Sequence, residues 1–124
     1  MGEDTASELY QSGRDAMDRG DFTTAVGHLQ RALALRPHYK TLELLGTALR
    51  ELQRPEEALV YLAAAAGLGN RQFRARYLLA EVLVGLGLTD DAIVKLEEAI
   101  ELNPSYRTAR ELLERIRATR PEPT

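Results

Sequence analysis

The sequence predicts an all-α protein built from three repeated pairs of helices, and its internal repeat is the main reason. Ala25 recurs as Ala58 and Ala92, at spacings of 33 and 34 residues. Matching residues also follow each alanine at four, seven, ten and twelve positions. These columns are Leu29, Leu62 and Leu96; Ala32, Ala65 and Ala99; Leu35, Leu68 and Leu102; and Pro37, Asn70 and Pro104. A period of this length is typical of stacked-repeat architectures.

The columns mark the second helix of each pair. Spacings of four, seven and ten residues place side chains on one stripe of an α-helix, so we expect this whole stripe to be buried. Alternating alanine and leucine suits close packing, because small residues let two backbones approach and large ones fill the space beside them. Pro37 and Pro104 are expected to end their helices, since proline lacks an amide donor.

A further helix is expected upstream of each of these, marked by apolar and small residues at spacings of three and four. They are Leu9, Gly13 and Ala16 in the first copy; Leu42, Leu45, Gly46 and Leu49 in the second; and Leu79, Ala80 and Leu83 in the third. The small residues Gly13, Gly46 and Ala80 predict close contact between paired helices.

Turn residues separate the two helices of each pair. Gly20 is expected to adopt a left-handed conformation, with Asp21 as the N-cap of the next helix. Pro55 is expected at the first helical position, followed by acidic residues in the first turn. Thr89 is expected to be the N-cap in the third pair. Further along that helix, Glu97 and Glu98 are expected to form a solvated acidic face.

The end of the chain predicts one more helix. Ala109, Leu112, Leu113 and Ile116 form an apolar stripe opposite charged residues. Repeat stacks usually need such an atypical helix to cover the last repeat. The expected organisation is a flexible N-terminus at 1–5, repeats at about 6–38, 39–72 and 73–106, a capping helix at 105–119 and a disordered tail at 120–124.

This pattern resembles the tetratricopeptide repeat family. The match is best from Gly20 to Pro37, where Gly-Asp-Phe is followed by the alanine, leucine and proline columns. The middle copy departs from the pattern, with Gln53 at the turn and Asn70 in the proline column. The resemblance covers residues 6–119 and implies a right-handed superhelix of antiparallel helix pairs, a TPR-like α-solenoid with about seven helices.

The resemblance also implies a binding surface, because in this family the first helices of successive repeats line a concave groove. The residues expected to line it are Tyr10, Arg14, Met17, Asp18, Lys40, Glu43, Thr47, Arg50, Glu51, Arg74, Tyr77, Glu81 and Val84. Four basic residues oppose four acidic ones in this set, so we expect a groove of mixed charge. Such a groove suits a peptide that carries both signs, or one gripped by aromatic and apolar contacts.

Several of these residues also allow a purely structural interpretation. Tyr10 and Tyr77 either contact a partner or pack between repeats, and Met17 is more often core filler. The groove charges either bind a partner or form internal salt bridges on a solvated face. One subgroup of the family clamps a C-terminal carboxylate with Lys, Asn and Arg, and the matching residues of this chain are Tyr10, Arg14, Thr47, Tyr77 and Glu81. Only Arg14 offers a positive charge there and Glu81 would repel a carboxylate, so we predict that the chain is not a carboxylate clamp.

Composition excludes several function classes. The chain has no cysteine and a formal net charge of −3 with both signs mixed, so disulfides, thiolate sites and a basic nucleic-acid-binding face are not expected. The longest apolar runs are too short for a membrane span. His28 and His38 lack partners at ligand spacing, and no catalytic motif occurs, so we expect no metal, no cofactor and no enzymatic activity. A cytoplasmic location fits this composition.

The predicted function is therefore a protein–protein interaction module or scaffold that binds a peptide or helix of a partner in its groove. One alternative is structural self-association, in which repeats stack end to end or the tail of one copy enters the groove of another. A less favoured alternative is a regulatory subunit of an enzyme.

Overall fold

The computed structural model describes residues 5–68 and 72–119, and this part of the chain forms seven helices and no strand. The helices are α1 (Thr5–Asp18), α2 (Phe22–Leu35), α3 (Tyr39–Glu51), α4 (Pro55–Gly67), α5 (Phe73–Gly85), α6 (Thr89–Leu102) and α7 (Arg107–Thr119). The all-α, TPR-like solenoid expected from the repeat is confirmed. Of the flexible N-terminus expected at 1–5, residue Thr5 is instead the first residue of α1, and residues 1–4 lie outside the described part, as do the expected tail at 120–124 and Asn70.

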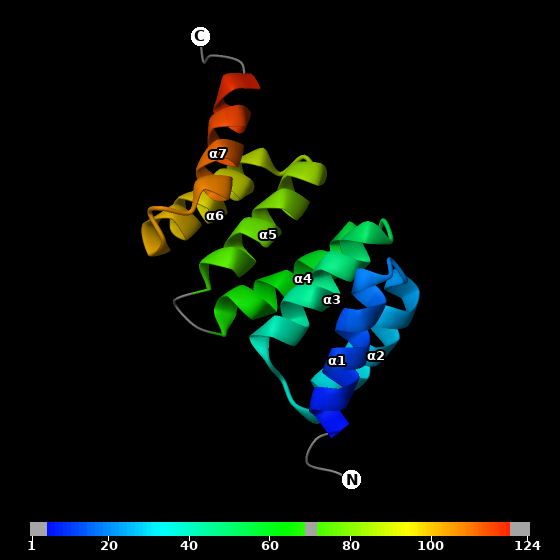
Figure 1. Ribbon diagram of the computed structural model, residues 1–124. Helices are drawn as coiled ribbons and strands as arrows, with labels where there is room; N and C mark the ends of the chain where they lie inside the picture. Colours follow the sequence, from blue (N-terminus) through cyan, green and yellow to red (C-terminus); the bar gives the residue numbers. More distant parts are fainter. Residues whose placement is uncertain (1–4, 69–71, 120–124) are drawn as a thin grey trace.

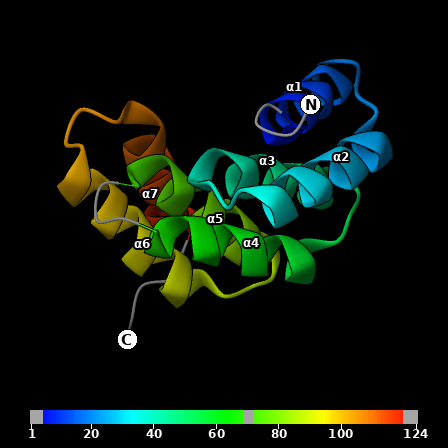
Figure 2. The same ribbon diagram turned by 90° about the horizontal axis from the view of Figure 1, so that it is seen from below.

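The helices pack as pairs that follow one another along the stack (Figure 1). Within a pair, α1 contacts α2, α3 contacts α4 and α5 contacts α6; between pairs, α2 contacts α3 and α4 contacts α5. The first helices also touch one another, α1 with α3 and α3 with α5. The view from below shows the same succession from α1 and α2 to α7 (Figure 2). The first helices are thus neighbours on one side of the stack.

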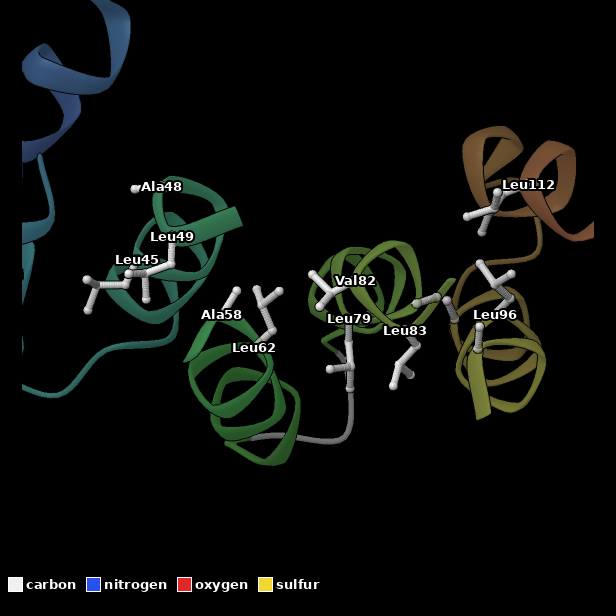
Figure 3. Close-up of a cluster of buried hydrophobic side chains, with 14 of the residues drawn as sticks. Leu45, Ala48, Leu49, Ala58, Leu62, Leu79, Val82, Leu83, Leu96 and Leu112 are labelled. Carbon is white, nitrogen blue, oxygen red and sulfur yellow. The ribbon is translucent and has the colours of Figure 1, made fainter. Parts of the chain in front are cut away.

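The expected core columns lie at the centre of this packing. Alanines 25, 58 and 92 and leucines 29, 62 and 96 are at most 1% exposed. Leu62 of α4 lies between the leucines of α3 and those of α5, and Leu96 of α6 continues the same cluster (Figure 3). One apolar core therefore runs through successive pairs, which is how stacked repeats stabilise one another.

The small residues of the first helices allow this close packing. A Cβ atom added to Gly46 would lie 2.4 Å from Cγ of Leu62, and one added to Gly13 would lie 2.6 Å from Cγ of Leu29. Both distances are shorter than any real Cβ contact, so only glycine fits at these two crossings. The close contact predicted at Gly13 and Gly46 is confirmed.

One part of the predicted stripe is wrong. The column ten positions after each alanine is not buried: Leu35 is 59% exposed, Leu68 56% and Leu102 38%. Leu35 and Leu102 are the last residues of their helices, and Leu68 lies just beyond α4. The stripe therefore continues past the point where a neighbouring helix can cover it.

The helix ends follow the expected turn chemistry with one exception. Gly20 has a φ of +75°, and the Asp21 carboxylate accepts a hydrogen bond from the Thr24 amide at 3.3 Å. Pro55 begins α4 as expected. Thr89, however, is the first residue of α6 rather than its cap, because the cap position is taken by Leu88, which offers no side-chain acceptor.

The closing helix α7 begins at Arg107, two residues later than expected, and packs on α6. Ala109, Leu112, Leu113 and Ile116 are all buried, which confirms the apolar stripe. The acidic face on α6 was expected to be only solvated, but it also forms ion pairs. Arg117 of α7 forms an ion pair with Glu97 at 3.0 Å. Glu98 forms ion pairs with Lys95 at 3.1 Å and with Arg76 at 3.3 Å.

Candidate functional site

A cavity of about 580 Å³ crosses the side of the stack formed by the first helices. We call it the groove cavity. It is lined by Tyr10, Arg14, Tyr39, Lys40, Glu43, Leu44, Gln72, Phe73 and Arg74. Five of the residues expected in the groove therefore come together from α1, α3 and α5. Tyr39, Leu44, Gln72 and Phe73 were not expected, because they flank the helix positions that the family pattern marks.

A second cavity, of about 410 Å³, lies at the other ends of α3 and α5. We call it the acidic cavity. It is lined by Arg50, Glu51, Gln53, Pro55, Glu81, Val82 and Gly85. The expected groove residues Arg50, Glu51 and Glu81 are therefore separated from the five in the groove cavity. The charges that are evenly mixed in the sequence are distributed unequally in space, with three cations and one carboxylate in the groove cavity and two carboxylates and one cation in the acidic cavity.

Some of the charged groove residues are paired with one another within the chain. Arg50 donates to Glu81 at 2.8 Å, joining α3 to α5, and Arg74 lies 3.4 Å from Glu43 in the same way. The internal salt bridges considered from sequence are thus present for these four residues. Arg14 and Lys40 form no ion pair with any described residue. These two cations are the ones available to a partner.

Glu43 is an unusual wall residue for the groove cavity, because it is only 8% exposed. Burial raises the pKa of its carboxyl group, while the nearby charges of Arg74 and Lys40 act in the opposite direction. The ion pair of this buried carboxylate with Arg74 joins α3 to α5 and fixes the position of Arg74 at the cavity mouth.

An aromatic cluster continues the surface beside these charges. The ring of Tyr106 meets Phe73 at 5.0 Å and Tyr77 at 5.6 Å, both edge to face. Tyr77 donates its hydroxyl to Glu81 at 2.8 Å. Burial and then this hydrogen bond raise the pKa of Tyr77 to about 12. Tyr106 was missed from sequence because it lies in the turn before α7, outside the repeat columns.

Most of the remaining expected residues contribute to packing, whereas Asp18 is exposed and lines neither cavity. Thr47 donates its hydroxyl to the backbone oxygen of Glu43 at 2.9 Å, and Met17 packs against the core. Tyr77 also packs on the core, so its structural interpretation holds alongside its place next to Glu81. Val84 packs on the same core.

The described side chains offer hydrogen bonds, charges and aromatic faces rather than a reaction centre. In residues 5–68 and 72–119, no three His, Cys, Asp or Glu side chains are grouped so that they could hold a metal ion. His38 is the N-cap of α3, and its Nδ1 accepts a hydrogen bond from the Lys40 amide at 3.1 Å. None of the described helices has the length and apolar character needed to cross a membrane.

Solved structures share this fold closely. The first TPR of Spaghetti (RPAP3) bound to HSP90 peptide SRMEEVD superposes with a TM-score of 0.89 at 18% identity, covering 95% of this chain and 94% of that one. The Yersinia enterocolitica type III secretion chaperone SycD in complex with a peptide of the translocator YopD gives 0.82 at 21% identity, covering 94% and 90%. MamA gives 0.88 at 23% identity, covering 94% and 69%.

Sequence comparison identifies the family itself. No curated protein sequence matches the chain. The family model described as "Anaphase-promoting complex, cyclosome, subunit 3" matches residues 18–99, which is 82 of the 124 residues. This family model is of the tetratricopeptide type, and its match begins at the end of α1 and runs into the last turns of α6. With the helix pairs, the core columns and the match together, the chain belongs to this family of tetratricopeptide repeat proteins.

Proposed function

We propose that this chain is a protein-interaction module that binds a peptide or helix of a protein partner across α1, α3 and α5. The groove cavity is the observation that carries this proposal: it is already formed, spans three helices and presents unpaired cations beside aromatic rings. A preformed surface loses little conformational entropy on binding. The neighbours with bound peptides, RPAP3 and SycD, support the same type of use for this fold.

The residues proposed to contact the partner are those expected from the sequence, together with the new members of the cavity wall. The first set is Tyr10, Arg14, Met17, Lys40, Glu43, Thr47, Arg50, Arg74, Tyr77 and Glu81. To these we add Tyr39, Gln72, Phe73 and Tyr106. Arg14 and Lys40 are the polar residues expected to contribute most, since Arg50 and Arg74 are already paired within the chain.

Site-specific photo-crosslinking tests the proposal. A photo-crosslinking amino acid replaces Gln72, which lines the groove cavity and makes no side-chain cap bond. The control places the same amino acid at Val60, which is 66% exposed on α4. We expect the Gln72 variant to capture a protein from the native lysate that the Val60 variant does not capture. Adding the Arg14→Glu substitution to the Gln72 variant should abolish this capture. Equal capture at both positions would contradict use of the groove.

The alternative functions stay predictions. Entry of the tail into a neighbour's groove concerns residues 120–124, which lie outside the described residues. End-to-end stacking predicts that the mass measured by light scattering rises with concentration. A catalytic role is not part of the proposal.

A further inference from the structure

A third cavity, of about 280 Å³, opens where the first pair of helices meets the second. We call it the rim pocket. It is lined by Ala6, Ser7, Tyr10, Gln11, Ala32, Arg36, His38, Lys40 and Thr41. These residues come from α1, the end of α2, the short connection and the start of α3. Tyr10 and Lys40 also line the groove cavity, so the two cavities adjoin at these side chains.

The charge of the rim pocket has one sign. Arg36 and Lys40 supply positive charge, and none of the lining residues is a carboxylate. Arg36 donates to the Ser7 hydroxyl at 3.4 Å, whereas Lys40 has no ion-pair partner among the described residues. Among the described residues that line the two adjoining cavities, the only carboxylate is Glu43, which is already paired with Arg74, whereas Arg14 and Lys40 form no ion pair. An anionic group is therefore the complementary ligand.

Thr41 gives independent evidence for a ligand. The residue is only 3% exposed and lines the rim pocket, yet its hydroxyl forms no hydrogen bond within the described part of the chain. Buried polar groups are normally hydrogen-bonded. Among the described residues, every side-chain oxygen without solvent contact has a hydrogen-bond partner. The Thr41 hydroxyl has no such partner, so it keeps some contact with solvent, and we infer that this contact is through the pocket that Thr41 lines. This hydroxyl is a free donor at the wall of a cationic cavity.

The start of α3 adds to this setting. The first turn of a helix leaves amide donors without intrahelical partners, and the helix dipole favours an anion there. The His38 ring accepts a hydrogen bond from the Lys40 amide, and no acidic residue occupies the first turn of α3. The pocket walls also include Ala6, Ala32 and the Tyr10 ring, which suit the methylene groups of an acidic side chain.

We propose that the rim pocket binds the carboxylate of one Asp or Glu side chain, carried by an acidic segment of the protein partner whose flanking residues lie in the groove cavity. The Thr41 hydroxyl donates to this carboxylate, and Lys40 neutralises its charge. This proposal rests on the proposed function, because the same partner occupies both cavities. It places the acidic contact at the junction of the first two repeats, away from Thr47, Tyr77 and Glu81.

Peptide titration followed by amide NMR tests the proposal on the full chain. The probe is an acetylated and amidated Gly-Glu-Glu-Glu-Gly peptide, so that its only anions are side-chain carboxylates. We expect the largest shift changes at Ser7, Lys40 and Thr41. Thr41→Val keeps the shape of the buried side chain and removes its donor, and we expect affinity to fall about tenfold. The exposed variant Lys40→Gln should cause a similar loss without any risk to the core.

Matched controls complete the design. Thr119→Val removes a hydroxyl of α7 that donates to the backbone of its own helix, outside all three cavities, so peptide affinity should not change. Unchanged affinity in both Thr41→Val and Lys40→Gln would overturn the proposal, as would equal shifts with a blocked Gly-Lys-Lys-Lys-Gly peptide. Stronger binding of inorganic phosphate or of oligouridine at the same amides would also overturn it, in favour of a phosphate ligand.

The proposal and the proposed function fail separately. If the protein captured at Gln72 still binds the Thr41→Val and Lys40→Gln variants with unchanged affinity, the rim pocket is not its anchor, although the groove function stands. If Gln72 captures nothing that Val60 does not, while the acidic peptide still shifts Thr41, the groove function fails and the carboxylate-binding pocket remains.

Discussion

Two of the helices that line the groove, α3 and α5, begin in the opposite way from α4 and α6 behind them. The outer helices α4 and α6 carry Glu56, Glu57 and two aspartates in their first turns. The groove helices α3 and α5 carry no acidic residue there. They place Lys40 and Arg74 at their second positions instead. Acidic residues stabilise a helix N-terminus and basic ones oppose its dipole. The helices α4 and α6 thus follow the rule for stability, whereas α3 and α5 depart from it where Lys40 and Arg74 face a cavity.

The two sets of helices also use glycine differently. Gly46 lies on a groove helix against Leu62, where a methyl group has no room. Gly27 lies on the outer helix α2, where an added Cβ atom would meet nothing within 4 Å. One glycine is required by packing, and the other only lowers helix propensity.

The largest expected effect tests this second contrast. Gly46→Ala should lower the free energy of unfolding by about 1 to 3 kcal/mol, because Leu62 is buried and surrounded and cannot move aside. Gly27→Ala should raise it by about 1 kcal/mol, since alanine is the better helix former. Urea unfolding followed by circular dichroism measures both. Equal effects of the two substitutions would contradict the contrast.

A second test separates stability from binding at the first turns. Glu56→Lys on α4 should lower the free energy of unfolding by about 0.3 to 1 kcal/mol, because it places a cation at the positive end of the dipole. Lys40→Gln on α3 should change stability by less than about 0.5 kcal/mol, since relief at the dipole is offset by loss of the attraction to Glu43. Only Lys40→Gln should weaken binding of the acidic peptide. If Glu56→Lys also weakened binding of the acidic peptide, the proposed difference between the first turns of α3 and α4 would be contradicted.

The buried Glu43 predicts a smaller effect that depends on pH. Its pKa is raised above the ordinary value of 4.5 by burial, so the folded chain holds this proton more tightly than the unfolded chain. The contribution of Glu43 to the free energy of unfolding therefore falls as pH rises from about 4.5 through the folded pKa. Glu43→Gln should remove this fall. Urea unfolding at pH 4 and pH 7 provides the comparison, and an identical pH difference in both proteins would count against it.

The smallest predicted effect concerns the groove edge at Tyr77. Its pKa is about 12, against an ordinary value of 10.0, and one cause is the hydrogen bond to Glu81. Glu81→Gln should lower this pKa toward 10.0 without reaching it, because burial is the larger cause. The ring-carbon NMR shift of Tyr77 during an alkaline titration reports the change. The wild type should lose stability between pH 10 and about 12, since the unfolded tyrosine ionises first.

Sequence periodicity predicted the helices well because the signal is local. The spacing of Ala58 and Leu62 defines a helix stripe that must be buried somewhere, and Gly46 signals a close crossing. The exposed Leu35 shows the limit of this reasoning, since periodicity does not reveal where the neighbouring helix ends. The candidate site was predicted as thirteen positions on the first helices, and five of them line one cavity.

The rest of the site depends on contacts between residues that are distant in sequence. The pair formed by Arg50 and Glu81 joins residues 31 positions apart. Because Arg50 and Arg74 are paired in this way, Arg14 and Lys40 are the groove cations that have no ion pair among the described residues. The rim pocket brings Ser7 beside Arg36 and Thr41, and no local pattern marks these residues. In the sequence, nothing distinguishes Thr41 from an ordinary polar residue at the start of a helix.

The sequence alone determined that this chain forms three helix pairs and a cap, because apolar period and turn chemistry act within each helix and repeat at a constant interval. Only the tertiary structure decided how the groove charges are distributed. Charge interactions depend on distance through space and on burial, and the stacking of α1, α3 and α5 sets both. It sorted an evenly mixed list into a cationic side and an acidic side, and it left one buried hydroxyl open to the cationic side.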